Sequence, residues 1–160
     1  MELELGSFFT VLVIDHDLQA RTFIDRSLRL AGVSAILCPN VFEGLHAIEH
    51  ANLIMLDFVM PDQDSYEFLL RREKPSHLAR ADHRAIVVMG PGCPQTGADF
   101  RNAGLSYLPK PFTQIELIDT IVKSISKRAP LAKPLSSLVP LGPEAQAKRV
   151  TEPANTVFEI

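Results

Sequence analysis

The sequence predicts a doubly wound α/β fold, in which helices cover both faces of a parallel sheet. Short runs of consecutive apolar residues recur along the chain, and such unbroken hydrophobicity is typical of parallel strands that are buried on both faces. Segments with apolar residues at helical spacing alternate with these runs. Because strand-to-strand crossovers are right-handed, the intervening helices fall on the two faces of the sheet.

Five segments are predicted as strands. Four of them are continuous apolar runs, at residues 9–14, 33–37, 53–56 and 86–89. The fifth surrounds Tyr107 and Leu108 and has a weaker pattern.

The first two helices have recognisable boundaries. The segment 18–31 places Ala20, Ile24 and Leu28 on one face and ends at Gly32, a natural C-cap. Asn40 can cap the second helix, with Glu43 at its third position.

Three further helices are predicted after residue 63. The third begins near Asp64 and runs through Phe68, and the fourth covers 96–103 and ends at Gly104. The fifth opens with the capping box Thr113-Gln114-Ile115-Glu116 and continues with apolar residues at helical spacing. This capping box predicts the best-defined helix start in the chain.

Length and composition indicate one globular domain with a tail. The 160 residues, 46% of them hydrophobic, can build one ordinary core but leave little for a second. We expect an N-terminal extension at 1–8, a domain at 9–127, and a disordered, Pro-rich tail at 128–160 that holds five of the 12 prolines. The tail is too short for a helix-turn-helix output domain.

Charge and terminal sequence exclude several functional classes. A net charge of -3, from 16 basic and 19 acidic residues, gives no support for nucleic-acid binding. The start MELELGSFF lacks the features of a signal peptide, and no stretch approaches the ~20 apolar residues of a membrane span. We therefore expect a cytoplasmic protein without membrane insertion, in which Cys38 and Cys93 are reduced thiols.

Charged residues follow three of the predicted strands. Asp15 comes after the first, Asp57 after the third and Lys110 after the fifth. The ligand crevice of an open parallel sheet lies beyond the carboxyl ends of its strands, so these side chains are expected to converge. Two adjacent carboxylates repel each other, and a divalent cation that prefers oxygen ligands relieves the repulsion. A lysine ammonium can then pair with a phosphate at the same place.

Three sequence blocks resemble the signatures of the response-regulator receiver family. They are VLVIDHD at 11–17, LIMLDFVMPDQDSYEFL at 53–69 and AGLSYLPKPF at 103–112, in the family's order and at similar spacing. The resemblance implies a flavodoxin-like sheet with strand order 2-1-3-4-5. It also implies that Asp57 is the phosphoacceptor, that Asp15 and the Val59 carbonyl help it to bind Mg²⁺, and that Lys110 contacts the phosphoryl group. A cis peptide would join Lys110 to Pro111.

The same resemblance implies a role in two-component or phosphorelay signalling. The phosphoryl donor would be a sensor histidine kinase or a phosphotransfer protein, and the phosphorylated domain would act on a downstream protein partner. Such a protein is not an enzyme beyond its own phosphorylation and dephosphorylation.

The sequence departs from the family pattern at the expected site. His16 stands where the family has a second metal-binding acid, and imidazole is a poor ligand for Mg²⁺, so cation affinity should fall. Met89 stands at the position of the family's Thr or Ser, or Gly90 does if the register slips by one, and neither has a hydroxyl. Tyr107 matches the family's rotating aromatic residue.

These departures leave two alternatives open. The first is a pseudo-receiver, a phosphorylation-independent scaffold, which His16 and Met89 favour. The second is a phosphatase of the haloacid-dehalogenase type, because Asp15-His16-Asp17 also looks like that family's DxD nucleophile motif. The absence of a recognisable cap insertion and of a late acidic metal motif counts against the phosphatase.

Overall fold

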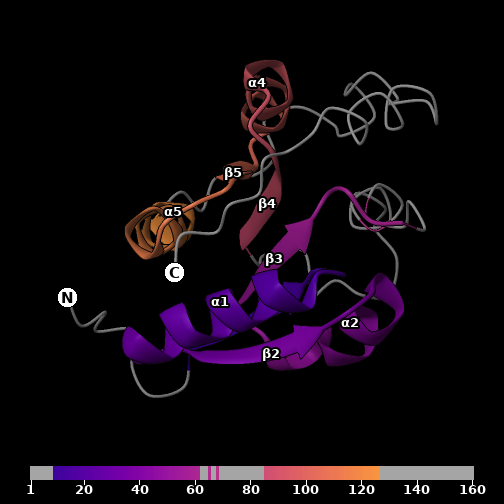
Figure 1. Ribbon diagram of the computed structural model, residues 1–160, viewed down its shortest axis with the longest axis vertical. Helices are drawn as coiled ribbons and strands as arrows, with labels where there is room; N and C mark the ends of the chain where they lie inside the picture. The colour runs from indigo at the N-terminus through magenta and orange to yellow at the C-terminus, as the bar shows by residue number, and fades with distance from the viewer. Residues whose placement is uncertain (1–8, 62–64, 66–67, 69–84, 127–160) are drawn as a thin grey trace.

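The computed structural model describes residues 9–61, 65, 68 and 85–126 and contains the predicted parallel sheet. All four strand pairings are parallel, and the order β2-β1-β3-β4-β5 confirms the doubly wound, flavodoxin-like topology (Figure 1). The strands are β1 (Thr10–Ile14), β2 (Ser34–Cys38), β3 (Leu53–Asp57), β4 (Ala85–Pro91) and β5 (Ser106–Lys110).

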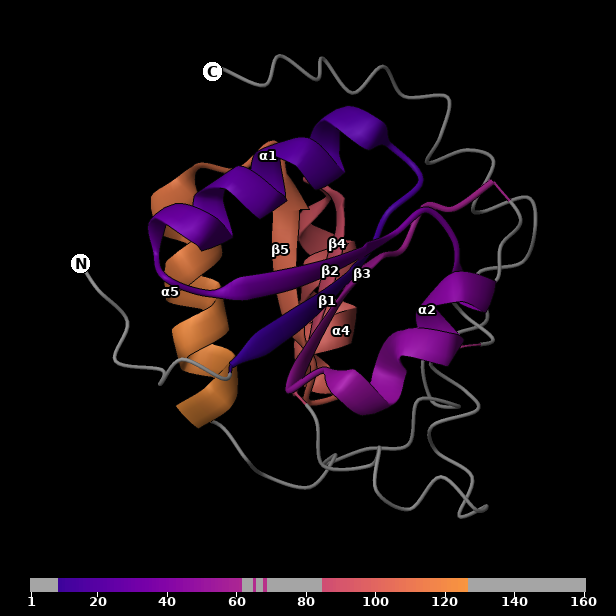
Figure 2. The same cartoon turned by 90° about the horizontal axis from the view of Figure 1, so that it is seen from below.

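Helices cover both faces of this sheet. In Figure 2, α1 and α5 lie on one side, and α2 and α4 lie on the other. The helices are α1 (Leu18–Leu30), α2 (Val41–Ala47), the short 3-10 helix η1 (Ile48–His50), α4 (Pro94–Asn102) and α5 (Gln114–Ser126).

The sheet separates two apolar clusters. Along β1 the side chains alternate, with Leu12 and Ile14 in the α2/α4 cluster and Val11 and Val13 in the α1/α5 cluster. All four are fully buried. Burial on both faces explains why this strand is a continuous apolar run rather than an alternating one.

The capping signals in the sequence predicted the helix ends correctly. The side chain of Asn40 accepts a hydrogen bond from the Glu43 amide at 2.8 Å. At the start of α5, the Thr113 amide donates to the Glu116 carboxylate at 2.8 Å, and the Glu116 amide donates back to Thr113 Oγ1 at 3.2 Å. Gly32 takes a φ of 75° after α1, a conformation that suits glycine beyond a helix end.

Several predicted segments fall outside the described residues. These are the N-terminal extension 1–8, the tail 128–160, and most of the third helix near Asp64. From that helix only Ser65 and Phe68 are described, and both are buried. Both cysteines are free, and no helix in the described ranges has the length and apolar character needed to cross a bilayer.

Candidate functional site

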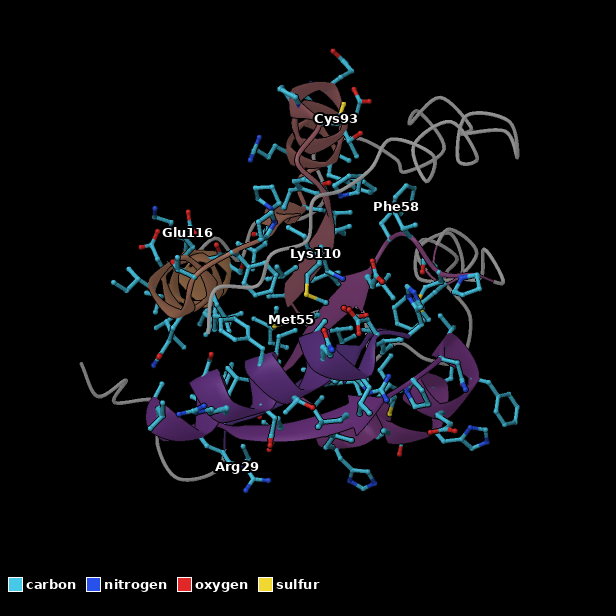
Figure 3. The ribbon with its side chains drawn as sticks, viewed as in Figure 1. Arg29, Met55, Phe58, Cys93, Lys110 and Glu116 are labelled. Atoms are coloured by element: carbon cyan, nitrogen blue, oxygen red, sulfur yellow. The ribbon has the colours of Figure 1, made fainter. Side chains whose placement is uncertain are left out.

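The site lies at the carboxyl edge of the sheet, where β1, β3 and β5 end. Parallel strands bring Asp15, Asp57 and Lys110 to this edge, although they are far apart in sequence. Figure 3 shows Lys110 at the same end of the sheet as Phe58, the residue that follows Asp57. The topology therefore gathers the three charged residues that the sequence singled out.

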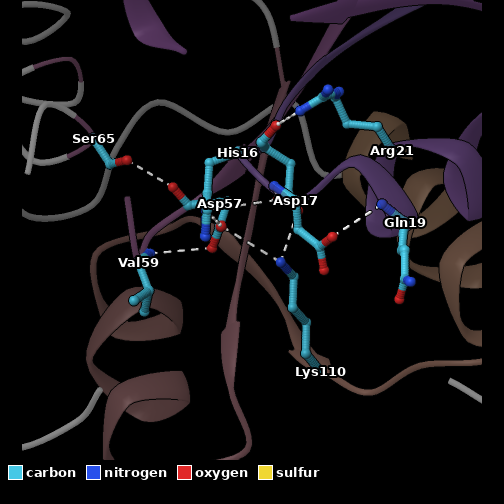
Figure 4. A network of polar contacts seen from close by, with 9 residues as sticks. His16, Asp17, Gln19, Arg21, Asp57, Val59, Ser65 and Lys110 are labelled. Carbon is cyan, nitrogen blue, oxygen red and sulfur yellow. Dashed lines mark hydrogen bonds and ion pairs between the residues drawn. The ribbon is translucent and has the colours of Figure 1, made fainter. Parts of the chain in front are cut away.

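Lys110 lies between the two carboxylates. Its Nζ donates to Asp15 Oδ2 at 2.7 Å. It also lies 3.5 Å from Asp57 Oδ2, and Figure 4 shows the Lys110 side chain reaching toward Asp57. Asp15 and Asp57 are buried, with 0% and 2% of their surface exposed, and the Lys110 side chain is 14% exposed. Buried carboxylates need charged or hydrogen-bonding partners, and this ammonium supplies one.

His16 also contacts the phosphoacceptor candidate. Its Nδ1 lies 3.1 Å from Asp57 Oδ2 and 4.0 Å from Asp15 Oδ1, while 45% of its side chain stays exposed. The hydrogen bond to Asp57 is the main reason why the pKa of His16 lies above its usual value. A protonated His16 would place a second positive charge beside Asp57.

The two other charged groups also have shifted pKa values. Burial, together with the negative charge of Asp57, raises the pKa of Asp15, and Lys110 offsets part of this effect. For Lys110, burial alone would lower the pKa and is the largest single effect. The charges of Asp57 and Asp15 and the hydrogen bonds to both outweigh it, so the pKa of the ammonium is raised. Lys110 is therefore charged at neutral pH.

Backbone and neighbouring side chains fix the two carboxylates. The Val59 amide donates to Asp57 Oδ1 at 3.1 Å, and the Asp17 amide donates to Asp15 Oδ1 at 2.9 Å. The side chain of Asp17 turns away from the site and caps α1 by accepting from the Gln19 amide at 2.9 Å.

Two residues that hold the site were not identified as such from the sequence. Arg21 donates from Nη1 to the Asp15 carbonyl at 2.6 Å, and Ser65 donates from Oγ to the Asp57 carbonyl at 2.6 Å (Figure 4). No sequence signal pointed to Arg21, because its partner is a backbone atom.

Met89 and Gly90 face opposite sides of the sheet. The Met89 side chain is fully buried in the α1/α5 cluster, and Met89 is the register partner of Asp57. Gly90 faces Tyr107 instead: a Cβ built on Gly90 would lie 2.7 Å from Tyr107 Oη. The structure therefore places Gly90, the second of the two positions that the sequence offered, against the hydroxyl of Tyr107.

The donor set fits a hard divalent cation in part. Asp15, His16 and Asp57 each offer an atom within 4.8 Å of the others. The two carboxylates suit Mg²⁺, which prefers oxygen ligands, whereas the His16 imidazole does not. Lys110 already occupies Asp15 Oδ2, so a cation would compete with an ammonium for that oxygen.

Sequence comparisons find curated relatives that match about three quarters of the chain. The chain is 32% identical to the DNA-binding transcriptional regulator NtrC of Rhizobium meliloti over 126 residues, which cover 76% of the chain and 25% of that protein. It is 30% identical to NtrC of Azospirillum brasilense, with 77% and 25% covered. The chain thus spans about a quarter of the length of these curated relatives. No protein-family model matches it.

Solved structures resemble the chain over most of its length. The chemotaxis protein CheY4 of Vibrio cholerae has a TM-score of 0.63 and 20% identity, covering 73% of this chain and 98% of that one. A CheY-like receiver domain protein from Methanospirillum hungatei has a TM-score of 0.62 and 22% identity, with 76% and 96% covered. The chain shares the doubly wound five-stranded fold of these structures and gathers acidic residues at the carboxyl edge of its sheet. In its fold, the described part of the chain is similar to these CheY-like receiver structures.

Proposed function

We propose that this chain is a receiver module of two-component or phosphorelay signalling that accepts a phosphoryl group on Asp57. One observation carries the proposal: a buried carboxylate at the end of β3 has a lysine ammonium 3.5 Å from Oδ2 and a second carboxylate beside that lysine. Such an arrangement can attract a phosphoryl group and hold it after transfer.

In the proposed reaction, an oxygen of the Asp57 carboxylate attacks the phosphorus of a phosphohistidine or a small acyl phosphate. The new O–P bond forms as the bond to the donor breaks, and the electron pair leaves with the imidazole nitrogen or the carboxylate of the donor. Lys110 then contacts the phosphoryl oxygens in place of Asp57 Oδ2. Because His16 Nδ1 lies 3.1 Å from that oxygen, His16 has to turn away for the donor to enter, and its exposed position leaves room for this.

Asp15, Asp57 and the Val59 carbonyl would hold Mg²⁺ during transfer. When bound, the cation neutralises negative charge on the phosphoryl group. His16 in place of an acid removes one oxygen ligand, so we expect weaker Mg²⁺ binding than in receivers with two adjacent acids.

The proposed partners follow from this chemistry. The donor is a sensor histidine kinase or a phosphotransfer protein, and the output is contact with a downstream protein. The chain is then a signalling module and not an enzyme with an external product. A cytoplasmic location stays a prediction from the sequence.

Acetyl phosphate and Mg²⁺ test the proposal directly. Intact-mass analysis should show the gain of one phosphoryl group, and hydroxylamine should remove it because it is an acyl phosphate. Asp57→Asn should abolish the gain. Asp119→Asn, which alters an exposed carboxylate on α5, should retain it and serves as the matched control.

A chain that stays unmodified under these conditions would instead be a phosphorylation-independent receiver. The observation that favours this second candidate is the neutralisation of both carboxylates from within the site, by Lys110 and by His16. The phosphatase alternative is not favoured, because the Asp17 side chain caps α1 instead of facing Asp15.

A further inference from the structure

Tyr107 is enclosed between β4 and α4. Only 6% of it is exposed, and its hydroxyl donates to the Pro91 carbonyl at 2.6 Å. Its ring stacks on Phe100 with centroids 5.6 Å apart and planes 6° apart, and the Arg101 guanidinium lies 6.0 Å from the ring centroid. We call this enclosure, formed by Gly90, Pro91, Gly97, Phe100 and Arg101, the Tyr107 socket.

Two glycines make room for the ring in this socket. A Cβ on Gly90 would lie 2.7 Å from Tyr107 Oη, closer than real Cβ contacts occur. A Cβ on Gly97 would lie 3.1 Å from Tyr107 Cδ1, on another part of the ring. Among the described glycines only Gly32 and Gly104 have a positive φ, so Gly90 is required for space and not for backbone conformation.

The Tyr107 socket lies close to Asp57, the proposed phosphorylation site. However, β4 has no polar side chain that could connect the two. Gly90 follows Met89 in β4. The Met89 carbonyl accepts a hydrogen bond at 2.8 Å from the amide of Phe58, the residue that follows Asp57. Met89 points into the α1/α5 cluster, and Gly90 has no side chain. A phosphoryl group on Asp57 would therefore find no hydroxyl at these two positions that could be drawn toward it.

Leaving the socket would be unfavourable for Tyr107. The ring would lose its stacking on Phe100, and the Pro91 carbonyl would lose its 2.6 Å hydrogen bond. The space beside Gly90 and Gly97 would then be empty, which costs further packing energy. The seated position is thus stabilised by contacts that do not depend on the charge of Asp57.

We propose that Gly90 is a positioning residue that seats Tyr107 between β4 and α4 whatever the phosphorylation state of Asp57. The surface formed by α4 and β5 is then preset and does not change when the domain is phosphorylated. The part that concerns the phosphorylated chain rests on the proposed function.

Fluorine NMR of the full chain can test whether the Tyr107 ring stays buried between β4 and α4. The protein has two tyrosines, so a Tyr66→Phe background labelled with 3-fluorotyrosine leaves one signal, that of Tyr107. The shift of this signal between H₂O and D₂O reports the exposure of the ring to water. We expect no solvent isotope shift before or after acetyl phosphate and Mg²⁺, with phosphorylation measured in parallel by intact mass.

Two matched variants complete the test. Gly90→Ala should expose the ring and produce a solvent isotope shift without any phosphodonor. Gly92→Ala should not, because a Cβ there meets its nearest neighbour, the Lys110 carbonyl, at 3.8 Å. Circular dichroism checks that both variants fold. If Gly90→Ala does not fold, the fluorine signal of the Tyr66→Phe background protein still shows whether the Tyr107 ring is buried in the socket.

Three results would contradict the proposal. They are a solvent-exposed Tyr107 ring in the unmodified background protein, exposure of the ring that appears on phosphorylation, or a Tyr107 ring in Gly90→Ala that is as protected from solvent as in the parent. Failure of the proposed function looks different. There the mass stays unchanged, while the unmodified protein and Gly90→Ala still decide whether Gly90 seats Tyr107.

Discussion

The imidazole Nδ1 of His16 lies 3.1 Å from Oδ2 of Asp57, so a histidine makes direct contact with the phosphoacceptor candidate. The contact joins a partly exposed loop residue to a carboxylate that is 2% exposed. It changes both the cation affinity and the pH dependence expected of the site.

His16→Asp should strengthen Mg²⁺ binding. The substitution replaces a nitrogen donor with carboxylate oxygens beside Asp15 and Asp57, and changes in metal surroundings of this kind alter affinity by about tenfold or more. Titration calorimetry with MgCl₂ measures the effect. His16→Asn, which removes the imidazole without adding charge, is the control, and equal affinity in the two variants would contradict the expectation.

Stability of the metal-free protein should depend on His16 at acid pH. Because the pKa of His16 is raised in the folded state, its contact with Asp57 stabilises the fold fully below the usual histidine pKa of about 6.5. This stabilisation is lost as the pH rises through the higher folded-state pKa. His16→Gln should therefore unfold at lower urea than the parent at pH 5.5 with EDTA present, and at the same urea concentration at pH 9. A constant difference across this range would argue against the charged contact.

Asp15→Asn should stabilise the metal-free fold at neutral pH. Burial and the charge of Asp57 raise the pKa of Asp15, so the ionised carboxylate is less favourable in the folded than in the unfolded chain. This penalty applies above the folded-state pKa and vanishes as the pH falls toward about 4, near the usual aspartate pKa. Urea unfolding in EDTA at pH 7 and pH 4 tests it. A variant less stable than the parent at pH 7 would show that the pairing with Lys110 outweighs the repulsion.

Lys110→Met should destabilise the domain at pH 7. Both carboxylates would lose their ammonium partner, and an unpaired buried polar group costs about 1–3 kcal/mol, or more when it is charged. The loss should be smaller in an Asp15→Asn background, because the two residues are in contact and their effects are coupled. Additive losses in this double-mutant cycle would contradict the coupling.

Lys123→Met provides the control for this cycle. Lys123 pairs with Asp119 on the surface of α5, where 64% and 55% of the two side chains are exposed. Removal of such an exposed pair should cost about 1 kcal/mol at most.

The sequence predicted the sheet and the gathering of charged residues because both follow from periodicity. Continuous apolar runs identify buried parallel strands, and residues at their carboxyl ends must meet at one edge. The capping residues Asn40 and Thr113 predicted helix starts for the same reason, since a cap is a local signal. The strand limits differed by one or two residues, as at β4, which extends to Pro91.

Other features of the site could not be predicted from local patterns. The hydrogen bonds of Arg21 and Ser65 end on backbone carbonyls, which have no sequence signature. The choice between Met89 and Gly90 depends on which face of the sheet each position occupies, and a one-residue change of register reverses the answer. In register Tyr107 pairs with Val88 and Gly90 with Pro109, and only the three-dimensional structure shows that the Tyr107 hydroxyl reaches Gly90.

The division of the apolar interior by the sheet has a consequence for how this domain can change. Phe58, Phe100 and Tyr107 belong to one cluster, while Met89, Phe112 and Leu117 belong to the other. Side chains separated by a layer of backbone share no packing partners, so substitutions in the two halves should add independently. Evolution or protein engineering could then remodel the half that carries Tyr107 without having to repack the half beneath α1 and α5.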